Sequence, residues 1–228
     1  SSRFNSWWRL RGRRALVTVP NTAGHPPPLV PSFRERENVV LTVGAVNFEK
    51  NPFAFVQLAC AVQKIRADLG VPPIKFVWLG TGPLLERIRN DIRQLGLEGS
   101  VFFDGFQSDP KPWYEKARIY YQPSTVDSMP LAVLDAFRFG VPTISSGAGG
   151  LPEMLGPELK DSVVNPSDVG TVARRVLETL EDKELWVLKS TAVYRRYLNE
   201  YGAEKWAERM DELISSAQKN TANQTKSR

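Results

Sequence analysis

Short runs of apolar, often β-branched residues alternate along this chain with longer segments whose apolar positions recur at helical spacing. The short runs are almost continuously apolar, which is typical of strands covered by helices on both faces. They predict six strands, at residues 39–43, 74–79, 101–103, 119–121, 142–145 and 162–164. Strands and helices that alternate in this way predict a doubly wound, Rossmann-like α/β domain on a parallel sheet.

The segments between the strands carry their own start and stop residues. Asn51 is a good helix cap, Pro52 suits the first helical position, and Gly70 ends the apolar stripe that follows. Later helices are predicted at 83–95, 130–139, 168–180, 184–200 and 203–217. We therefore expect a connector at 1–37, the Rossmann-like domain at 38–200, a C-terminal helix at 201–218 and a disordered tail at 219–228.

The composition excludes several classes of protein. The 228 residues are 42% hydrophobic and 24% charged, which argues against disorder and against a membrane-embedded body. The net charge of +5 comes from the ends, because residues 1–14 and 219–228 hold eight bases and no acid. The body between them is near neutral, so we expect no nucleic-acid partner. With one cysteine, Cys60, and one histidine, His25, a zinc site is not expected, and we predict a core position for Cys60 and a loop position for His25.

In a doubly wound sheet the ligand lies beyond the carboxyl ends of the strands. Three loops follow strands there, at 44–50, 80–83 and 123–130. The Gly80-Thr-Gly82 segment is a weak match to the dinucleotide fingerprint, because Leu85 stands where that pattern needs Gly or Ala. The chain has neither a GxxxxGK[ST] phosphate loop nor an Asp-X-Asp triplet. A dehydrogenase is therefore disfavoured, and no metal site is predicted.

Two aspartates make the third loop informative. Asp127 precedes a predicted helix whose first-turn N–H groups can hold an anion, and Asp135 follows within an apolar stretch, where a half-buried carboxylate needs a partner. The spacing leaves a second interpretation open. Asp127 could cap the helix, and Asp135 could pair with Arg138 across one turn.

Taken together, these segments resemble the nucleotide-binding half of the family 4 retaining glycosyltransferases, which have the B-type double-Rossmann (GT-B) fold. The similarity runs from about residue 15 to residue 218. It is carried by segments in the family's order and spacing: Val43-Gly44 with Lys50-Asn51, 79–83, 101–106, 122–124, Asp127 to Asp135 with Met129-Pro130-Leu131 between them, 140–142 and 149–153.

The resemblance implies a site for a UDP-, GDP- or other nucleoside-diphosphate sugar that needs no metal and no cofactor. Lys50 would meet the diphosphate, Asp127 the hydroxyls of the donor sugar and Asp135 the ribose, with Lys50 and Asp127 as the catalytic residues. The base would lie beside Phe106 and Gln107. The binding residues that it implies are Gly44, Lys50, Gly80, Gly82, Phe106, Gln107, Asp127, Ser128, Met129, Pro130, Leu131 and Asp135.

The chain departs from the family's pattern at three positions. Ala45 stands where an arginine is usual, and the loss of one charge-assisted contact would weaken phosphate binding by ~1.5–3 kcal/mol. Asp127 and Asp135 replace a pair of glutamates, so each carboxylate must lie nearer its ligand.

The resemblance also implies an N-terminal half that binds the acceptor and that this sequence lacks. The segment 1–37 resembles the hinge into the donor half, and the helix at 201–218 resembles those that cross back. We therefore expect a domain that binds donor but does not transfer sugar by itself. Residues 7–14, Trp-Trp-Arg-Leu-Arg-Gly-Arg-Arg, are open to two interpretations, a peripheral membrane contact or a helix packed on the other half.

The sequence thus predicts the donor-binding domain of a retaining glycosyltransferase with a saccharide or lipid-linked acceptor. A cytoplasmic location is expected, since no signal peptide is evident and sugar nucleotides are found there. An alternative is a non-catalytic module that binds nucleotide sugars or docks a partner.

Overall fold

The computed structural model describes residues 19–226, with side chains as far as residue 218. A six-stranded sheet forms the centre, in the order β3-β2-β1-β4-β5-β6, and every pair of neighbouring strands is parallel. The strands are β1 Glu37–Val43, β2 Lys75–Leu79, β3 Val101–Phe103, β4 Ala117–Gln122, β5 Thr143–Ser146 and β6 Val163–Val164. The predicted doubly wound α/β class is confirmed, and each predicted strand is present.

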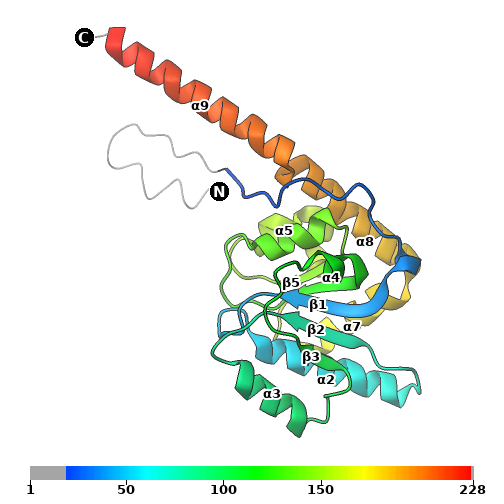
Figure 1. The fold of residues 1–228 in the computed structure, drawn as a ribbon. Coiled ribbons are helices and arrows are strands. Elements are labelled where there is room, and N and C mark those ends of the chain that lie inside the picture. The colour runs from blue at the N-terminus through cyan, green and yellow to red at the C-terminus, as the bar shows by residue number, and fades with distance from the viewer. Residues whose placement is uncertain (1–18, 227–228) are drawn as a thin grey trace.

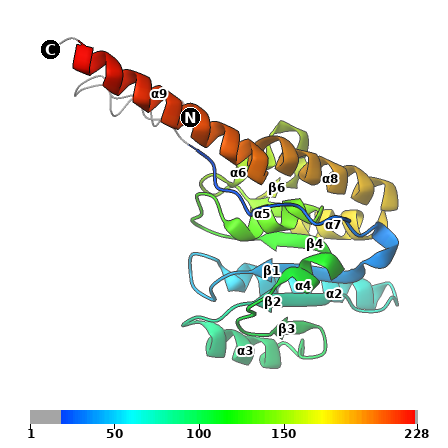
Figure 2. The same ribbon diagram turned by 45° about the horizontal axis from the view of Figure 1, so that its top comes forward.

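Helices cover both faces of the sheet (Figures 1 and 2). The α-helices are α2 Pro52–Asp68, α3 Leu85–Gln94, α4 Lys111–Lys116, α5 Leu131–Arg138, α6 Leu151–Leu155, α7 Val169–Glu181, α8 Lys183–Arg196 and α9 Ala203–Lys226. Two 3-10 helices, η1 Phe33–Glu35 and η2 Pro157–Ser162, and a π-helical turn, η3 Tyr197–Tyr201, complete the described elements.

Alternate residues of each strand enter two separate cores. Val40, Trp78 and Tyr121 pack with α2, α3 and α7 on one face. Leu41 and Tyr120 pack on the other face with α4, α5, α6 and α8. Because both faces are buried, the strands are apolar almost throughout, which is the pattern that the sequence shows.

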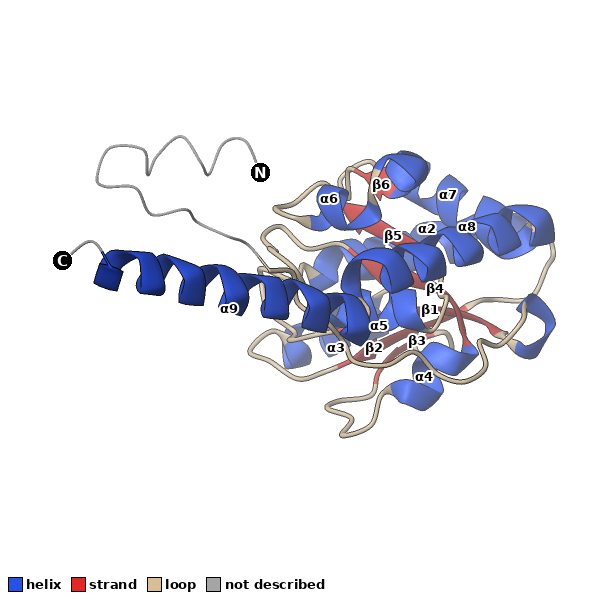
Figure 3. Ribbon diagram, turned by 90° about the horizontal axis from the view of Figure 1, so that it is seen from above, coloured by secondary structure: helices blue, strands red, loops and turns tan. Residues whose placement is uncertain are grey.

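The observed helices differ from the predicted ones in three places. Helices α4 and α6 were not predicted, because six and five residues are too few for a helical period to stand out. The predicted helix 184–200 ends as α8 at Arg196, and η3 follows it. Residues 219–226, predicted to be disordered, continue α9, which runs to Lys226 and projects away from the body (Figure 3). They lack an apolar stripe, but they also lack Gly and Pro, so nothing in the sequence breaks the helix.

The connector approaches the sheet along α5 and η3. The Tyr197 hydroxyl and the Gly24 carbonyl are hydrogen-bonded over 2.5 Å, and the Asn21 N–H lies 3.1 Å from Met129 Sδ. Residues 7–14, interpreted as a peripheral membrane contact or as a helix packed on the other half, lie outside the described residues.

Candidate functional site

The loops that follow β1 and β2 are tied together at the carboxyl end of the sheet. The Trp78 indole N–H donates to the Gly44 carbonyl over 2.9 Å, and the Val46 N–H donates to the Thr81 carbonyl over 2.9 Å. A Cβ at Gly80 would lie 1.9 Å from the Gly44 oxygen, and one at Gly82 would lie 2.4 Å from the Val46 oxygen. These two glycines therefore let the loops approach closely, and their predicted contact with a nucleotide stays a prediction.

Lys50 and Asp127 meet at this edge of the sheet. Lys50 ends the loop after β1, where its backbone N–H donates to the Asn47 side-chain oxygen over 3.0 Å. Its Nζ lies 2.5 Å from Asp127 Oδ2, and the two side chains are 23% and 9% exposed. The Thr125 N–H also donates to the Glu49 carbonyl over 2.8 Å, which holds the two loops side by side. The structure thus brings together two predicted site residues that are 77 positions apart in the sequence.

A buried polar network supports the Asp127 carboxylate from below. Gln122 Nε2 donates to Asp127 Oδ2 over 3.2 Å, and the Ser124 hydroxyl donates to the same oxygen over 3.1 Å. The Tyr120 hydroxyl in turn donates to Gln122 Oε1 over 2.7 Å. Gln122 and Ser124 are each 1% exposed. No role was predicted for either residue from the sequence, although polar residues at the end of an apolar strand were a signal of such support.

The interpretation of Asp127 as a helix cap is wrong. Helix α5 begins at Leu131, Pro130 occupies the N-cap, and no side chain caps the helix. Asp127 lies three residues before that cap, and its carboxylate is held by Lys50 and the network instead. The Val133 N–H donates to the Pro130 carbonyl over 3.1 Å, whereas the N–H groups of Leu131 and Ala132 donate to no residue from 19 to 218 and stay available to an anion.

Two glycines, Gly149 and Gly150, let the loop after β5 approach the loop around Asp127 closely. Gly149 has a φ of +54°, and a Cβ there would lie 1.8 Å from the Asp127 carbonyl oxygen. A Cβ at Gly150 would lie 1.9 Å from the Ser128 oxygen, and the Gly150 N–H donates to the Asp127 carbonyl over 3.0 Å. The close approach requires glycine at both positions. In the sequence these two residues belonged to the family resemblance, and no role in this close approach was predicted for them.

Asp135 pairs with Arg138 on α5, as the second interpretation of the spacing predicted. The two side chains lie 2.7 Å apart and are 22% and 15% exposed. Burial raises the pKa of Asp135, and the charge of Arg138 opposes that shift. Arg138 also donates to the His25 carbonyl over 3.3 Å. The expected contact of Asp135 with a ribose stays a prediction.

The remaining predicted residues line the same edge. Phe106 is 77% exposed, and the Gln107 side-chain N–H donates to the Asp104 carbonyl over 3.0 Å. At the start of α5, Ser128 is exposed, Met129 and Pro130 are more covered, and Leu131 is 53% exposed.

Cys60 packs against the core as predicted, and His25 is an exposed loop residue.

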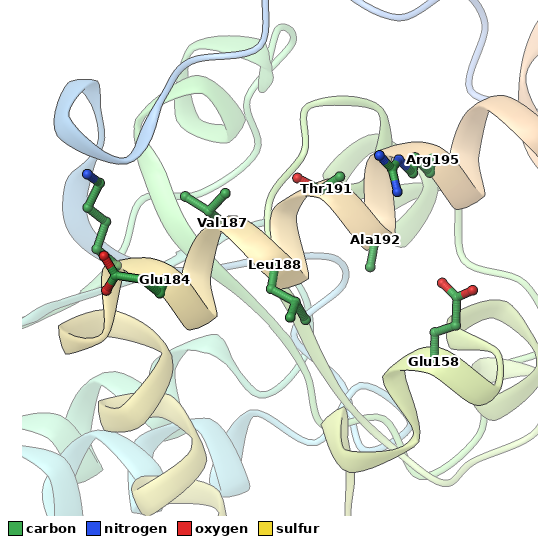
Figure 4. Close-up of a pocket in the computed structure, with 8 residues that line it drawn as sticks. Glu158, Glu184, Val187, Leu188, Thr191, Ala192 and Arg195 are labelled. Atoms are coloured by element: carbon green, nitrogen blue, oxygen red, sulfur yellow. The ribbon is translucent and has the colours of Figure 1, made fainter.

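One hollow adjoins this edge of the sheet, and another lies away from it. One of about 490 Å³ is lined by Asn51, Ser124 and Thr125 together with the loops after β5 and β6, so it adjoins the Lys50 and Asp127 pair. A second, of about 630 Å³, lies along α8 (Figure 4). Its wall is formed by Lys183, Glu184, Val187, Leu188, Thr191, Ala192 and Arg195 of α8 with Glu158 of η2. None of the predicted site residues lines the second hollow.

Within residues 19–226 no cluster of three or more His, Cys, Asp and Glu side chains is placed to hold a metal ion. Within the same residues no helix combines the length and the apolar character that crossing a membrane requires.

Solved structures share this fold. Sucrose-phosphate synthase from Thermosynechococcus elongatus superposes with a TM-score of 0.73 at 21% identity, over 95% of this chain and 55% of that one. The C-terminal domain of a glycosyl transferase group 1 family protein from Francisella tularensis superposes with a TM-score of 0.64 at 18% identity, over 78% of this chain and 96% of that domain. The chain therefore has the Rossmann-like fold found in GT-B glycosyltransferases.

The family follows from the sequence comparison. The model of the glycosyl transferases group 1 family matches residues 30–204, and the chain belongs to this family. It is 29% identical over 207 residues to 2-deoxystreptamine N-acetyl-D-glucosaminyltransferase of Streptomyces fradiae, which covers 84% of this chain and 48% of that enzyme. It is 27% identical over 150 residues to an α-1,4-N-acetyl-D-galactosaminyltransferase of Campylobacter jejuni that is named for a diphosphoundecaprenol-linked glycan. That match covers 65% of this chain and 40% of the enzyme, so the chain spans less than half of either relative.

Proposed function

We propose that this domain binds a nucleoside-diphosphate sugar at the carboxyl ends of β1 and β4, as the donor-binding part of a family 4 retaining glycosyltransferase. The observation that carries the proposal is the ion pair of Lys50 with Asp127, which lies four residues before the start of α5. An ammonium group and the N-terminus of a helix are both suited to a diphosphate. The carboxylate is an acceptor for the hydroxyls of a sugar attached to it.

The chemistry that this arrangement supplies is stabilisation of the leaving group. Negative charge builds on the diphosphate as the bond to the sugar breaks. Lys50 and the amides of α5 would meet that charge without a metal ion. The acceptor would be a saccharide or a lipid-linked glycan held by a further domain, and the name of the Campylobacter relative supports this class of acceptor. Transfer would then require both domains.

Calorimetry on the 228-residue chain tests the donor site. The titrants are UDP, GDP, UDP-glucose, UDP-N-acetylglucosamine and GDP-mannose. We expect saturable binding of at least one nucleotide and a loss of at least ~10-fold in affinity in Lys50→Ala, the weakening expected when a charge-assisted hydrogen bond is removed. Lys75→Ala is the matched control, because Lys75 is an exposed lysine at the opposite, amino end of β2. Absence of binding by every nucleotide in the unsubstituted chain contradicts the proposal.

One observation favours a second candidate, a non-catalytic module. Ala45 is exposed at the position where the resembling family has an arginine, so the diphosphate would meet one cation fewer. Such a module would bind nucleotide sugars weakly or dock a partner. Ala45→Arg separates nucleotide binding from partner docking, because tighter UDP binding in this variant shows a working diphosphate site, and no change favours a module that docks a partner.

A further inference from the structure

A hollow at the amino ends of the strands brings two arginines together. Because neighbouring strands are all parallel, their amino ends share the edge of the sheet that lies opposite to the candidate donor site. The hollow at this edge has a volume of about 320 Å³. Its lining comes from η1, β1, β4, the ends of α2 and α7 and the loop before β2: Phe33, Asn38, Arg66, Ile74, Arg118, Leu180 and Glu181.

The charge of Arg118 has no counter-ion among the described residues. Its Cζ lies 3.9 Å from the centre of the Phe33 ring, which covers one face of the guanidinium. Its Nη2 donates to the Phe33 carbonyl over 3.2 Å, and its Nη1 donates to the Asn38 side-chain oxygen. Its buried Nε has no acceptor, and no carboxylate from residue 19 to residue 218 forms an ion pair with it. Burial lowers the pKa of Arg118, so its charge is partly desolvated without compensation.

Arg66 supplies a second guanidinium from a fixed position. Its side chain is 11% exposed, and its Nε donates to the Pro72 carbonyl over 2.5 Å. Its Nη1 donates to Glu181 Oε1 over 2.7 Å, whereas its Nη2 donates to no residue from 19 to 218. The Glu181 side chain is 58% exposed and can turn into water while Pro72 still holds Arg66. Arg66 therefore has N–H groups for a further acceptor.

We propose that this hollow is a phosphate-binding site, separate from the candidate donor site. Arg118 and Arg66 reach it from β4 and from α2, and the oxygens of a tetrahedral phosphate can accept from both guanidinium groups. A carboxylate has two oxygens in one plane and a single charge, so it suits one arginine better than two. The hollow is larger than a phosphate group, and Ile74 and Leu180 give it an apolar wall. Its occupant is free phosphate or the phosphate of a small organic ester.

Calorimetric titration with sodium phosphate at constant ionic strength tests the site. Every titration uses the 228-residue chain with Lys50→Ala, which removes the lysine of the candidate donor site. We expect saturable phosphate binding in this background and a loss of at least ~10-fold when Arg118→Met is added, because charge-assisted hydrogen bonds are lost. Arg34→Met is the matched control. Arg34 is exposed on η1 and has no hydrogen bond or ion pair with any residue from 19 to 218, so its loss should change affinity less than about 2-fold.

Glu181→Gln should have the opposite effect. Glutamine is of similar size but has no charge to compete with phosphate for Arg66, so we expect binding about 2- to 5-fold tighter, the range for removal of an exposed ion pair. Damage to the fold would weaken binding, so a gain in this variant assigns the loss in Arg118→Met to the site. Glycerol 3-phosphate distinguishes the two occupants, because an ester site binds it more tightly than phosphate and a site for free phosphate binds it more weakly.

The outcomes are independent of the proposed function. No phosphate binding in Lys50→Ala, or binding that is unchanged by Arg118→Met and by Glu181→Gln, overturns the inference. Sodium acetate that binds as tightly as phosphate overturns the assignment of the hollow to phosphate. The donor site stands in each of these cases if the unsubstituted chain binds UDP, and it fails by itself if UDP and the other nucleotides do not bind while phosphate does.

Discussion

Tyr120 and Gln122 are joined beneath the candidate site: the Tyr120 hydroxyl donates to Oε1 of Gln122 over 2.7 Å. Both residues are fully buried on β4, and the Gln122 side-chain N–H donates to the Asp127 carboxylate. The next residue, Tyr121, is equally buried but faces the other core, where its hydroxyl has no partner among the described residues. The hydroxyl groups of these two adjacent tyrosines therefore differ in what they contribute to the stability of the fold.

This difference predicts opposite outcomes for the two Tyr→Phe substitutions. Tyr120→Phe leaves the Gln122 carbonyl oxygen buried without its donor, which should lower the free energy of unfolding by about 1–3 kcal/mol. Tyr121→Phe removes a buried hydroxyl that has no partner and should leave stability unchanged or raise it. Urea unfolding of the two variants measures both effects. Equal destabilisation would mean that the hydrogen bond from Tyr120 to Gln122 contributes no more to stability than the unpaired hydroxyl of Tyr121.

The glycine at position 149 should be essential to the loop that carries Asp127. Gly149→Ala places a Cβ 1.8 Å from the Asp127 carbonyl oxygen at a φ of +54°, so the loop must move. We expect a lower Tm and weaker UDP binding. Gly147→Ala is the control in the same loop, because a Cβ there meets only Val163 at 3.8 Å, an ordinary contact. A Gly149→Ala variant that melts and binds like Gly147→Ala would contradict the required close approach.

The sheet could be predicted from the sequence, and so could the edge at which Lys50 and Asp127 lie, but the pairing of these two residues could not. Continuous apolar runs mark strands buried on both faces, and the carboxyl ends of such strands are where ligands bind. Lys50 and Asp127 are 77 residues apart, so only the parallel arrangement of β1 and β4 brings them within 2.5 Å. Asp135 and Arg138 differ because they are three positions apart on one helix, which makes their pairing visible in the sequence.

The short helices could not be predicted from the sequence either. A five-residue helix such as α6 has too few turns to show a period, and its position depends on contacts from outside. Arg196, at the end of α8, supplies one of them by donating to the Glu153 carbonyl over 2.6 Å. Contacts of this kind, between residues 43 positions apart, are set by the fold and not by local sequence.

Arg36 should be one of the largest single contributors to stability. It is 3% exposed and donates to the carbonyls of Tyr114, Ala117 and Phe139 over 2.7, 2.8 and 2.5 Å. Burial lowers its pKa to about 10, so at neutral pH it stays charged. Arg36→Met leaves these carbonyls without their donor, and we expect a loss of roughly 3 kcal/mol or more.

Thermal unfolding measures that loss against Arg34→Met. Arg34 is an exposed arginine two positions away, so its substitution changes the net charge equally without uncovering buried carbonyls. The Arg34 variant should keep the Tm of the unsubstituted chain. Similar melting of the two variants would mean that the Arg36 hydrogen bonds are replaced by water.

The buried charge of Lys189 should lower the free energy of unfolding, and the size of this effect should depend on pH. Its side chain is 7% exposed between α8 and α7, where Nζ donates to the Thr179 hydroxyl over 2.9 Å. Burial, and next the charge of Arg175, lower the pKa of Lys189, while Glu178 and Asp161 oppose the shift. Between the lowered pKa and the ordinary value of 10.5, the unfolded chain binds more protons than the folded one. The contribution of Lys189 to stability therefore rises with pH across that range and is least favourable below it.

Lys189→Met removes this charge and leaves an unbranched side chain that is one atom shorter. The Thr179 hydroxyl still donates to the Arg175 carbonyl over 2.8 Å, so no buried donor is left without an acceptor. We expect a Tm higher by roughly 2–4 °C at pH 7, the shift that about 1 kcal/mol gives in a domain of this size. The advantage should shrink as the pH approaches 10.5. Lys183→Met, at the exposed start of α8, should show neither effect, and an advantage of Lys189→Met that is independent of pH would assign it to packing instead of charge.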